Sequence, residues 1–281
     1  MGSYSPREFS GPLHSPGDHR LTLTTDSLSI RMRLNRFLAS AGLGSRRGVE
    51  EIIQSGQVRI NGRVVTDLAT QVKPTDAVKV GSRLIRSERL IHAILHKPKG
   101  FLCTADDERE RRTIFDLLPA NWPRVFHVGR LDKESEGLLI VTNDGDLSLH
   151  LTHPRFKMEK EYEVGLDRPF DPIHREKLLR GMHIEGGWAK AEHVSQIGSK
   201  ALRVVLRQGL KRQIRLMFKD LDYEVTHLRR LRIGPVALGA LPSGEWRLLS
   251  AKEVALLKKA PAPEPPKKRA APKSTRMTNP E

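Results

Sequence analysis

Asp132 is the residue of this sequence best placed to do chemistry. It lies between two basic residues, Arg130 and Lys133, and glycines stand on either side at Gly129 and Gly137. A carboxyl group with an ordinary pKa of about 3.9 is ionised at neutral pH. Burial raises that pKa, so a buried aspartate needs a nearby cation to keep its charge. An ordinary aspartate in a surface loop is the alternative interpretation.

Two apolar stretches are expected to position this residue. Residues 124–128 and 138–141 each predict a strand of a buried sheet, and the polar segment between them carries Asp132. The Asn-Asp-Gly sequence at 143–145 predicts a turn and a cap for a following helix. The sequence therefore predicts a carboxylate in a loop between two buried strands.

Residues 129–145 have the pattern G-R-L-D-x-x-S/T-x-G-L-L-x-x-T-N-D-G. This pattern closely resembles the catalytic motif of the S4-domain ribosomal RNA pseudouridine synthases, the RsuA/RluB/RluE/RluF family. The resemblance implies that the chain isomerises a uridine of ribosomal RNA with Asp132 as its catalytic carboxylate. Two positions depart from the family pattern: Ser135 stands where threonine is common, and Leu216 stands where a second arginine often follows Arg215.

The resemblance also implies the other members of the site. Tyr162, in a Lys-Glu-Tyr stretch, matches the active-site tyrosine that stacks on the target uracil, and Ile214 would pack against the base from the other side. In this family an arginine of a Gln-Ile-Arg stretch pairs with the catalytic aspartate, so Arg215 is the expected partner of Asp132. Arg212 is the alternative partner, and spacing alone does not separate the two.

The expected reaction breaks the N-glycosidic bond, turns the uracil and joins C5 to C1′. Its target base must first leave the stack, at a cost of a few kcal/mol. Asp132 would attack C1′, attack C6, or remove the C2′ proton to form a glycal, and we favour the glycal route. Arg130 and Lys133 would hold the phosphates of the flipped nucleotide, with a generic basic rim as the alternative.

We expect no cofactor and no metal, because this isomerisation needs no redox step, phosphate donor or metal ion. The sequence contains no Walker-type phosphate loop and no H-E-x-x-H zinc motif. Its single cysteine, Cys103, excludes an internal disulfide and a cysteine-based zinc site, and suits a reducing cytoplasm. We expect Cys103, His153 and the three tryptophans to be ordinary core or surface residues.

The formal net charge of +16 favours a polyanionic partner, because lysine and arginine neutralise phosphates and release counterions. No apolar run approaches the roughly 20 residues of a membrane helix, and the first thirty residues lack the apolar segment of a secretory signal peptide. We therefore expect a cytoplasmic protein that binds ribosomal RNA or a pre-ribosomal particle, without membrane association. No heptad pattern is present, so we expect a monomer.

A small module precedes the catalytic motif. Apolar spacing predicts a helix over about 34–41, Ser45 is placed to cap a second helix, and Asn-Gly at 61–62 predicts a hairpin. This order of elements, with the sequence R-L-N-R-F-L-A-x-x-G-x-x-S-R-R, resembles the S4 RNA-binding domain. The resemblance implies an RNA-binding face, and a solvated basic surface is the alternative. Its expected RNA-binding residues are Arg33, Arg36, Arg46 and Arg47.

Composition predicts five parts along the chain. They are a disordered extension (1–30), the S4 domain (31–80), a linker (81–90), a catalytic domain (91–257) and a disordered basic tail (258–281). In the catalytic part, strands outnumber helices without regular alternation, so the fold class is α+β, with a largely antiparallel mixed sheet flanked by helices. A strand is expected at 101–103 and a helix at 171–180.

Three functions compete at this point. The first is a synthase acting on 23S rRNA, because the Lys-Glu-Tyr and Gln-Gly-x-x-Arg-Gln-Ile-Arg stretches look most like the large-subunit branch, with 16S rRNA as the runner-up. The second is a non-catalytic S4-type RNA-binding assembly factor. The third is a carboxylate-based hydrolase of another substrate, since one acid and one tyrosine are not exclusive to pseudouridine formation.

Overall fold

The computed structural model describes residues 31–105, 107 and 109–259. The predicted disordered extension (1–30) lies outside them, as does the predicted basic tail (258–281) from residue 260 onward, whereas Lys258 is the last residue of a helix. The described residues form two compact units: the first contains residues 31–39 and 44–86, and the second contains residues 40–43 and the described residues from 87 onward. Among the described residues, no helix is long and apolar enough to cross a membrane.

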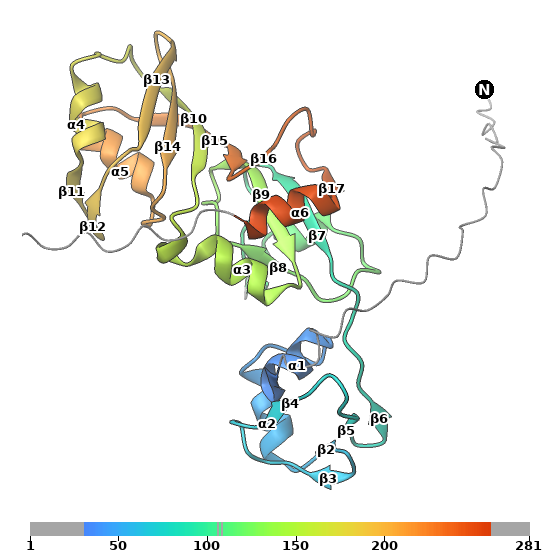
Figure 1. Cartoon of the computed structure of the whole chain (residues 1–281). Coiled ribbons are helices and arrows are strands. Elements are labelled where there is room, and N and C mark those ends of the chain that lie inside the picture. The colour runs from blue at the N-terminus through green and yellow to red at the C-terminus, as the bar shows by residue number, and fades with distance from the viewer. Residues whose placement is uncertain (1–30, 106, 108, 260–281) are drawn as a thin grey trace, which may run out of the picture. The chain divides into compact units, whose positions relative to one another are not determined.

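The first unit has two short helices and two small sheets, shown in blue to teal in Figure 1. One sheet has the strand order β3-β2-β5-β6, and the other pairs β1 with β4. The elements are β1 (Met32–Arg33), α1 (Leu34–Ser40), α2 (Gly48–Gln54), β2 (Val58–Ile60), β3 (Arg63–Val64), β4 (Gln71–Val72), β5 (Val78–Val80) and β6 (Arg83–Leu84).

The predicted helix pair and hairpin of this unit are confirmed. Leu38 of α1 and Ile53 of α2 are fully buried, as their helical spacing requires. Asn61 and Gly62 join β2 to β3 with φ values of 50° and 84°, the two positive values that a tight hairpin turn of this type needs. The predicted linker at 81–90 is shorter than expected, because β6 pairs with β5 inside it.

Exposure explains why β6 was missed. Both of its residues are exposed, so the segment has none of the apolar alternation that reveals a half-buried strand.

The second unit is built on a nine-stranded sheet with the order β13-β14-β10-β15-β9-β7-β17, to which β8 adds at β9 and β16 at β15. The pair β9–β15 is parallel, and every other strand pair of this sheet is antiparallel. The predicted α+β class with a largely antiparallel mixed sheet is therefore confirmed.

The elements of the second unit, in chain order, are β7 (His92–Lys97), η2 (Ile114–Leu117), β8 (Phe126–Val128), β9 (Glu136–Thr142), α3 (Gly145–Thr152), η3 (Pro154–Phe156), β10 (Lys160–Leu166), α4 (His174–Arg180), β11 (Met182–Ile184), β12 (Gly187–Ala189), β13 (His193–Gly198), β14 (Ala201–Leu206), α5 (Gln213–Lys219), β15 (Val225–Ile233), β16 (Val236–Ala237), β17 (Trp246–Leu248) and α6 (Ala251–Lys258).

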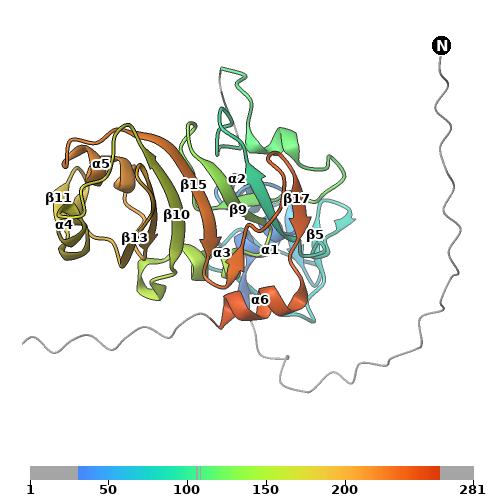
Figure 2. The same ribbon diagram turned by 90° about the horizontal axis from the view of Figure 1, so that it is seen from above.

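The sheet is covered differently in its two halves, as Figure 2 shows. Around β10, β13 and β14, the apolar core forms against α4 and α5. Around β7 and β9, Leu138 and Ile140 pack in the core beneath α3 and α6, while Leu139 and Val141 belong to a separate core that includes η2. Alternate residues of β9 thus face opposite sides, as a strand requires, and both of its faces are buried.

The predicted helix start after residues 143–145 is confirmed by its cap, because the Asp144 carboxylate accepts hydrogen bonds from the first turn of α3. Thr113 and Ser250 cap η2 and α6 with reciprocal capping boxes. Two other predictions need correction. The expected strand at 101–103 is a single isolated bridge at Leu102. The expected helix at 171–180 begins at His174, because residues 171–173 form a turn held by the Asp171 side chain.

Candidate active site

Asp132 lies in the loop between β8 and β9, and its side chain is one-third exposed (34%). Its Oδ2 atom lies 3.7 Å from Nη1 of Arg212, the residue immediately before α5. Arg212 has a φ of 54°, a value that few residues other than glycine adopt. The carboxylate is therefore open to a substrate from one side and faces a guanidinium on another.

Lys97, at the end of β7, holds the Asp132 loop in place through hydrogen bonds. Its side chain is fully buried, and Nζ donates hydrogen bonds to the carbonyl oxygens of Pro98 (3.0 Å), Asp132 (3.2 Å), Lys133 (3.3 Å) and Ser135 (2.8 Å). Burial lowers the pKa of the Lys97 ammonium group, and nearby acidic groups oppose that shift. Lys97 was not among the site residues predicted from the sequence. The available signal for it was a lysine that precedes a proline at the end of a strand.

Laterally paired residues form one row across five neighbouring strands, and this row ends at Lys97. In order the row contains Val204, Tyr162, Arg230, Gly137 and Lys97. Laterally paired residues of a sheet point to the same face, and adjacent strands lie about 4.8 Å apart. Tyr162 is thus about two strand spacings from Gly137, on the face where Lys97 holds the aspartate loop.

Gly137 is required in this row. It has a φ of +109°, and a Cβ atom there would lie 2.3 Å from the carbonyl oxygen of Arg230 on the parallel neighbour β15. Both the backbone conformation and the close approach of the two strands therefore exclude a side chain.

We expect Gly137→Ala to lower the free energy of unfolding by at least about 3 kcal/mol, because the strand pair must separate to admit the methyl group. Gly129→Ala is the matched control: Gly129 also has a positive φ (+68°), but nothing lies within 4 Å of the added carbon. The control should cost about 1–2 kcal/mol. Urea denaturation of both variants checks this, and equal losses would contradict the clash.

The two candidate partners of Asp132 are now separated. Arg212 forms the ion pair with Asp132, and a role of Arg215 as partner of the carboxylate during the reaction stays a prediction. Arg215 instead donates from Nη1 to the Val225 carbonyl (2.7 Å) and from Nη2, at 3.4 Å each, to the Glu134 carbonyl and the Ser135 hydroxyl. Burial lowers the pKa of Arg215, and the Arg212 charge acts in the same direction. Arg215 therefore connects α5 to the aspartate loop through backbone contacts.

Comparison with known proteins identifies the family. Residues 91–220 match the RNA pseudouridylate synthase family, and residues 32–78 match the S4 domain. The dual-specificity RNA pseudouridine synthase RluF of Escherichia coli (strain K12) is 38% identical over 256 residues, which is 89% of this chain and 87% of RluF. The ribosomal large subunit pseudouridine synthase B of Bacillus subtilis (strain 168) is 33% identical over 232 residues, covering 80% of this chain and 95% of that protein.

The chain belongs to the RNA pseudouridine synthase family. A solved structure described as a pseudouridylate synthase matches the synthase with a TM-score of 0.60 and 28% sequence identity, over 80% of this chain and 99% of that one. The predicted family, S4 domain and isomerase class are thereby confirmed. RNA is accordingly the partner of the synthase.

The other predicted site residues of the synthase have different surroundings. Tyr162 is half-buried on β10, against the core that α4 and α5 cover. Ile214 is 4% exposed and belongs to that same core, so its expected contact with the target base is not supported. Arg130 and Lys133 are exposed on either side of Asp132, where their predicted phosphate contacts are sterically open.

One buried and one partly buried cation near Tyr162 were not predicted. Arg230 is 3% exposed; its Nε donates to the Leu138 carbonyl (2.7 Å), and its Nη2 has no hydrogen-bond partner among the described residues. Lys160 precedes Tyr162 by two positions on β10, and its Nζ donates to the Met158 carbonyl (3.0 Å). Burial, followed by the Arg230 charge, lowers the pKa of Lys160 to about 8. No pattern in the sequence separates these residues from the many exposed lysines and arginines.

The Lys160 shift predicts a pH dependence of stability. Its pKa of about 8 in the folded protein lies below the ordinary value of 10.5, so the unfolded chain binds more protons between these values. The free energy of unfolding should therefore gain a contribution from Lys160 as pH rises from about 8 towards 10.5. We expect this rise to be absent from Lys160→Met, with urea denaturation of both proteins across that range as the measurement. Parallel pH profiles would contradict the shift.

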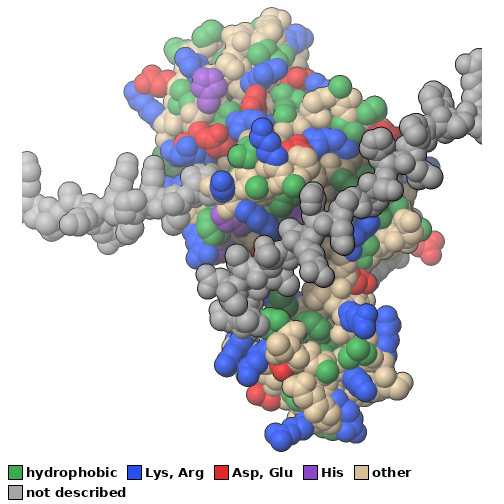
Figure 3. Space-filling view, turned by 45° about the vertical axis from the view of Figure 1, so that its right-hand side comes forward, with side chains coloured by type: hydrophobic (Ala, Val, Ile, Leu, Met, Phe, Trp, Pro, Cys, Tyr) green, Lys and Arg blue, Asp and Glu red, His purple; other side chains and the backbone are tan. Residues whose placement is uncertain are grey.

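In the S4 unit, the predicted RNA-binding arginines lie near the starts of the two helices. Arg33, Arg46 and Arg47 are exposed, and Arg36 is partly buried on α1. Figure 3 shows lysine and arginine side chains at several places on the visible face of this unit. Their contact with RNA stays a prediction.

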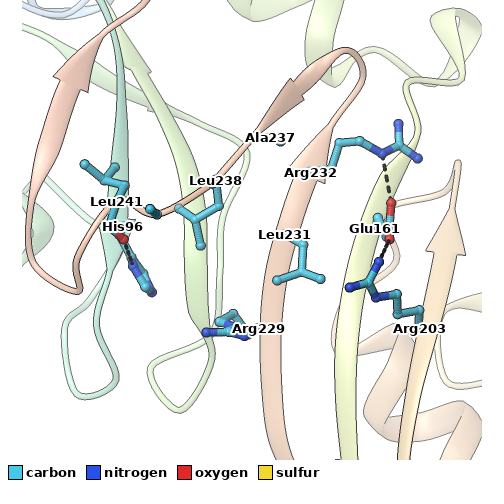
Figure 4. A pocket seen from close by; sticks show the side chains of 11 residues that line it. His96, Glu161, Arg203, Arg229, Leu231, Arg232, Ala237, Leu238 and Leu241 are labelled. Carbon is cyan, nitrogen blue, oxygen red and sulfur yellow. Dashed lines mark hydrogen bonds and ion pairs between the residues drawn. The ribbon is translucent and has the colours of Figure 1, made fainter. Parts of the chain in front are cut away.

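A hollow of about 490 Å³ is lined by Glu161 and other residues of the sheet (Figure 4). Because Glu161 precedes Tyr162 on β10, the hollow lies on the sheet face opposite the Tyr162 side chain. Arginines line it, and glutamates of β10 pair with them: Arg203 and Arg232 with Glu161, and Arg229 with Glu163. A register shift of β15 against β10 brings Arg229 and Arg232, three residues apart, to the same face. Because its charges are paired within the sheet, we assign this hollow no part in the active site.

Proposed function

We propose that the synthase isomerises one uridine of 23S rRNA, with Asp132 as the catalytic carboxylate acting on a flipped-out base. The observation that carries this proposal is the position of Asp132: partly open, 3.7 Å from the Arg212 guanidinium, on a loop fixed by Lys97. The Arg212 guanidinium also leaves one side of the carboxylate open to the substrate. The name of the large-subunit synthase from Bacillus subtilis supports the choice of rRNA.

The chain supplies residues for each step of this reaction. Asp132 removes the C2′ proton, and the N-glycosidic bond breaks to give a glycal and a uracil anion. The uracil turns against the Tyr162 ring, C5 bonds to C1′, and the proton returns to C2′. The C5 proton then leaves and N1 gains one, so that atoms and charge balance. Arg130, Lys133 and Arg212 hold the nucleotide and its phosphates during the turn, while Arg215 keeps the loop in place.

An isotope effect tests the first step. Ribosomal RNA fragments carrying deuterium at C2′ of the target uridine should react several-fold more slowly than protonated fragments, because a C2′–H bond breaks in the glycal route. Deuterium at C5 of the same uridine is the control, because it shows whether loss of the C5 proton at the end of the reaction limits the rate. A C2′ effect close to one, measured under single-turnover conditions, would favour attack of Asp132 at C1′ or at C6.

The rRNA target is tested by mapping pseudouridines in 23S and 16S rRNA from a deletion strain. We expect one 23S position to lose its modification and to regain it with the wild-type gene, but not with the Asp132→Asn gene. Loss of a 16S position instead would identify the runner-up, a small-subunit synthase. An unchanged map in both rRNAs, together with normal RNA binding, would favour the non-catalytic assembly factor.

Ribosomal RNA as substrate, and the single cysteine, place the synthase in the cytoplasm in this proposal. The expected monomer stays a prediction, and light scattering of the purified full chain measures it directly.

A further inference from the structure

Trp188 is a large aromatic residue on the surface of the catalytic unit. It lies in β12 opposite His183 of β11, and 48% of its side chain is exposed. The other two tryptophans, Trp122 and Trp246, contact each other with ring centroids 4.6 Å apart. Exposing half of a tryptophan leaves a large apolar area in water, so this ring is the unusual one of the three.

The Trp188 ring is held in one position. The His183 ring contacts it at an interplanar angle of 75°, with centroids 4.9 Å apart. On another side it lies directly over Gly181, where an added Cβ would be 2.7 Å from the indole Nε1. A ring fixed by its neighbours loses little further conformational entropy when a second ring stacks on it.

Hydrogen bonds connect this hairpin to the helix start beside Asp132. Gln208 donates to the Trp188 carbonyl (3.0 Å) and accepts from Gln213 (3.1 Å), the first residue of α5. Gln213 also donates to the Lys190 carbonyl (3.3 Å). Arg212, the ion-pair partner of Asp132, is the residue before Gln213. The backbone that carries the exposed ring is therefore hydrogen-bonded to the start of α5, next to the ion-pair partner of Asp132.

Basic residues lie along this connection. Lys190 follows Trp188 by two positions, and its side chain is 45% exposed with Nζ 3.4 Å from the Glu192 carboxylate. Lys211 and Arg212 are exposed beside the glutamine network. An exposed aromatic ring among lysines and arginines is the arrangement by which proteins bind unpaired RNA: the cations contact phosphates, and the ring stacks on a base.

We propose that Trp188, supported by His183, forms a stacking subsite for one unpaired base of the RNA substrate. The subsite positions the RNA strand and recognises the flat face of a base rather than its identity. This inference rests on RNA as the substrate, and it depends neither on the choice of rRNA nor on the role of Asp132. The chemistry of the ring and its basic surroundings favour an RNA base over an apolar protein partner.

Fluorescence of Trp188 gives a direct test. In the full chain carrying Trp122→Phe and Trp246→Phe, Trp188 is the sole tryptophan, and its emission should be quenched as a short unpaired oligoribonucleotide saturates the protein. Anisotropy of fluorescein-labelled RNA measures saturation independently. Saturation without a change in emission would overturn the proposal, as would failure of the wild-type chain to bind unpaired RNA. Because no turnover is needed, this result is independent of the catalytic proposal.

Binding by variants gives the second test. Trp188→Ala should raise the Kd for the unpaired RNA about 5- to 150-fold, the effect of losing one stacked base, and Trp188→Phe should restore most of the affinity. Trp188→Ala should leave the slope of log Kd against log salt unchanged, whereas Lys190→Gln should reduce it by about one phosphate contact.

Ile173→Ala is the matched control, because Ile173 is 74% exposed on the same unit but lies before α4, and its Kd should equal that of the wild type. Circular dichroism confirms that each variant is folded. Should Trp188→Ala and Ile173→Ala bind equally well, or should Trp188→Phe bind no better than Trp188→Ala, the stacking subsite is refuted.

Discussion

Asp132→Asn is expected to bind ribosomal RNA with nearly the affinity of the wild type and to form pseudouridine about 10⁴-fold more slowly. Asparagine keeps the size of the side chain and its hydrogen-bonding oxygen, so the loop held by Lys97 should keep its shape. It cannot accept a proton at neutral pH, and removal of a general base costs about 10²–10⁴-fold in rate. Single-turnover assays on a ribosomal RNA fragment, with Kd measured separately, give both quantities.

Glu134→Gln is the matched control for this experiment. Glu134 is a carboxylate of the same loop, two residues further on and exposed, and its replacement removes the same charge. Its turnover should remain within about threefold of the wild type. Equal losses in both variants would mean that the negative charge of the loop matters and that Asp132 has no special role. Wild-type turnover by Asp132→Asn would refute the catalytic assignment.

Lys97→Met should lower the free energy of unfolding by about 3–5 kcal/mol, the usual cost of removing one partner from a buried charged network. Four carbonyl groups share the Lys97 ammonium, and methionine fills its space without a donor. We also expect turnover to fall about 100-fold in the fraction that is folded, because a displacement of about 1 Å in the aspartate loop is enough for a loss of this size. Urea denaturation and single-turnover rates measure the two effects.

Lys99→Met separates this effect from a general loss of positive charge. Lys99 lies two residues beyond Lys97, in the exposed turn after β7, and its replacement should change stability by less than about 0.5 kcal/mol. A comparable loss in Lys99→Met would show that charge, rather than the buried hydrogen bonds, is responsible. Full turnover by a folded Lys97→Met protein would show that the loop keeps its catalytic shape without this anchor.

Asp132 and Lys97 have different roles in the proposed site. Asp132 is the group proposed to touch the substrate, while Lys97 and Arg215 act on the backbone that carries it. The loop has one anchor from the β7 side and another from α5, so elements from distant parts of the sequence meet at residues 132–135. Preorganisation of this kind keeps a reacting group in place without help from the substrate.

Much of the site could be predicted from the sequence, because motifs are local. The segment 129–145 contains the aspartate, the glycines that its turns require and the cap of α3 in one continuous stretch. The family, the S4 module and the mixed sheet were all indicated by patterns of this kind. The missed strand β6 and the shortened helix α4 show the limit, since short exposed elements have weak periodicity.

The sequence by itself determined the family and the residues proposed to carry the chemistry, Asp132 in its motif and Tyr162 on its strand. Only the tertiary structure decided which cation contacts the Asp132 carboxylate and which cations hold its loop. The sequence offered Arg212 and Arg215 three positions apart, and the turn of α5 places the first on the carboxylate and the second on the loop backbone. Burial likewise singles out Lys97 and Arg230 among the lysines and arginines that the structure describes. Pairing and desolvation depend on contacts between distant segments, and a linear pattern does not contain them.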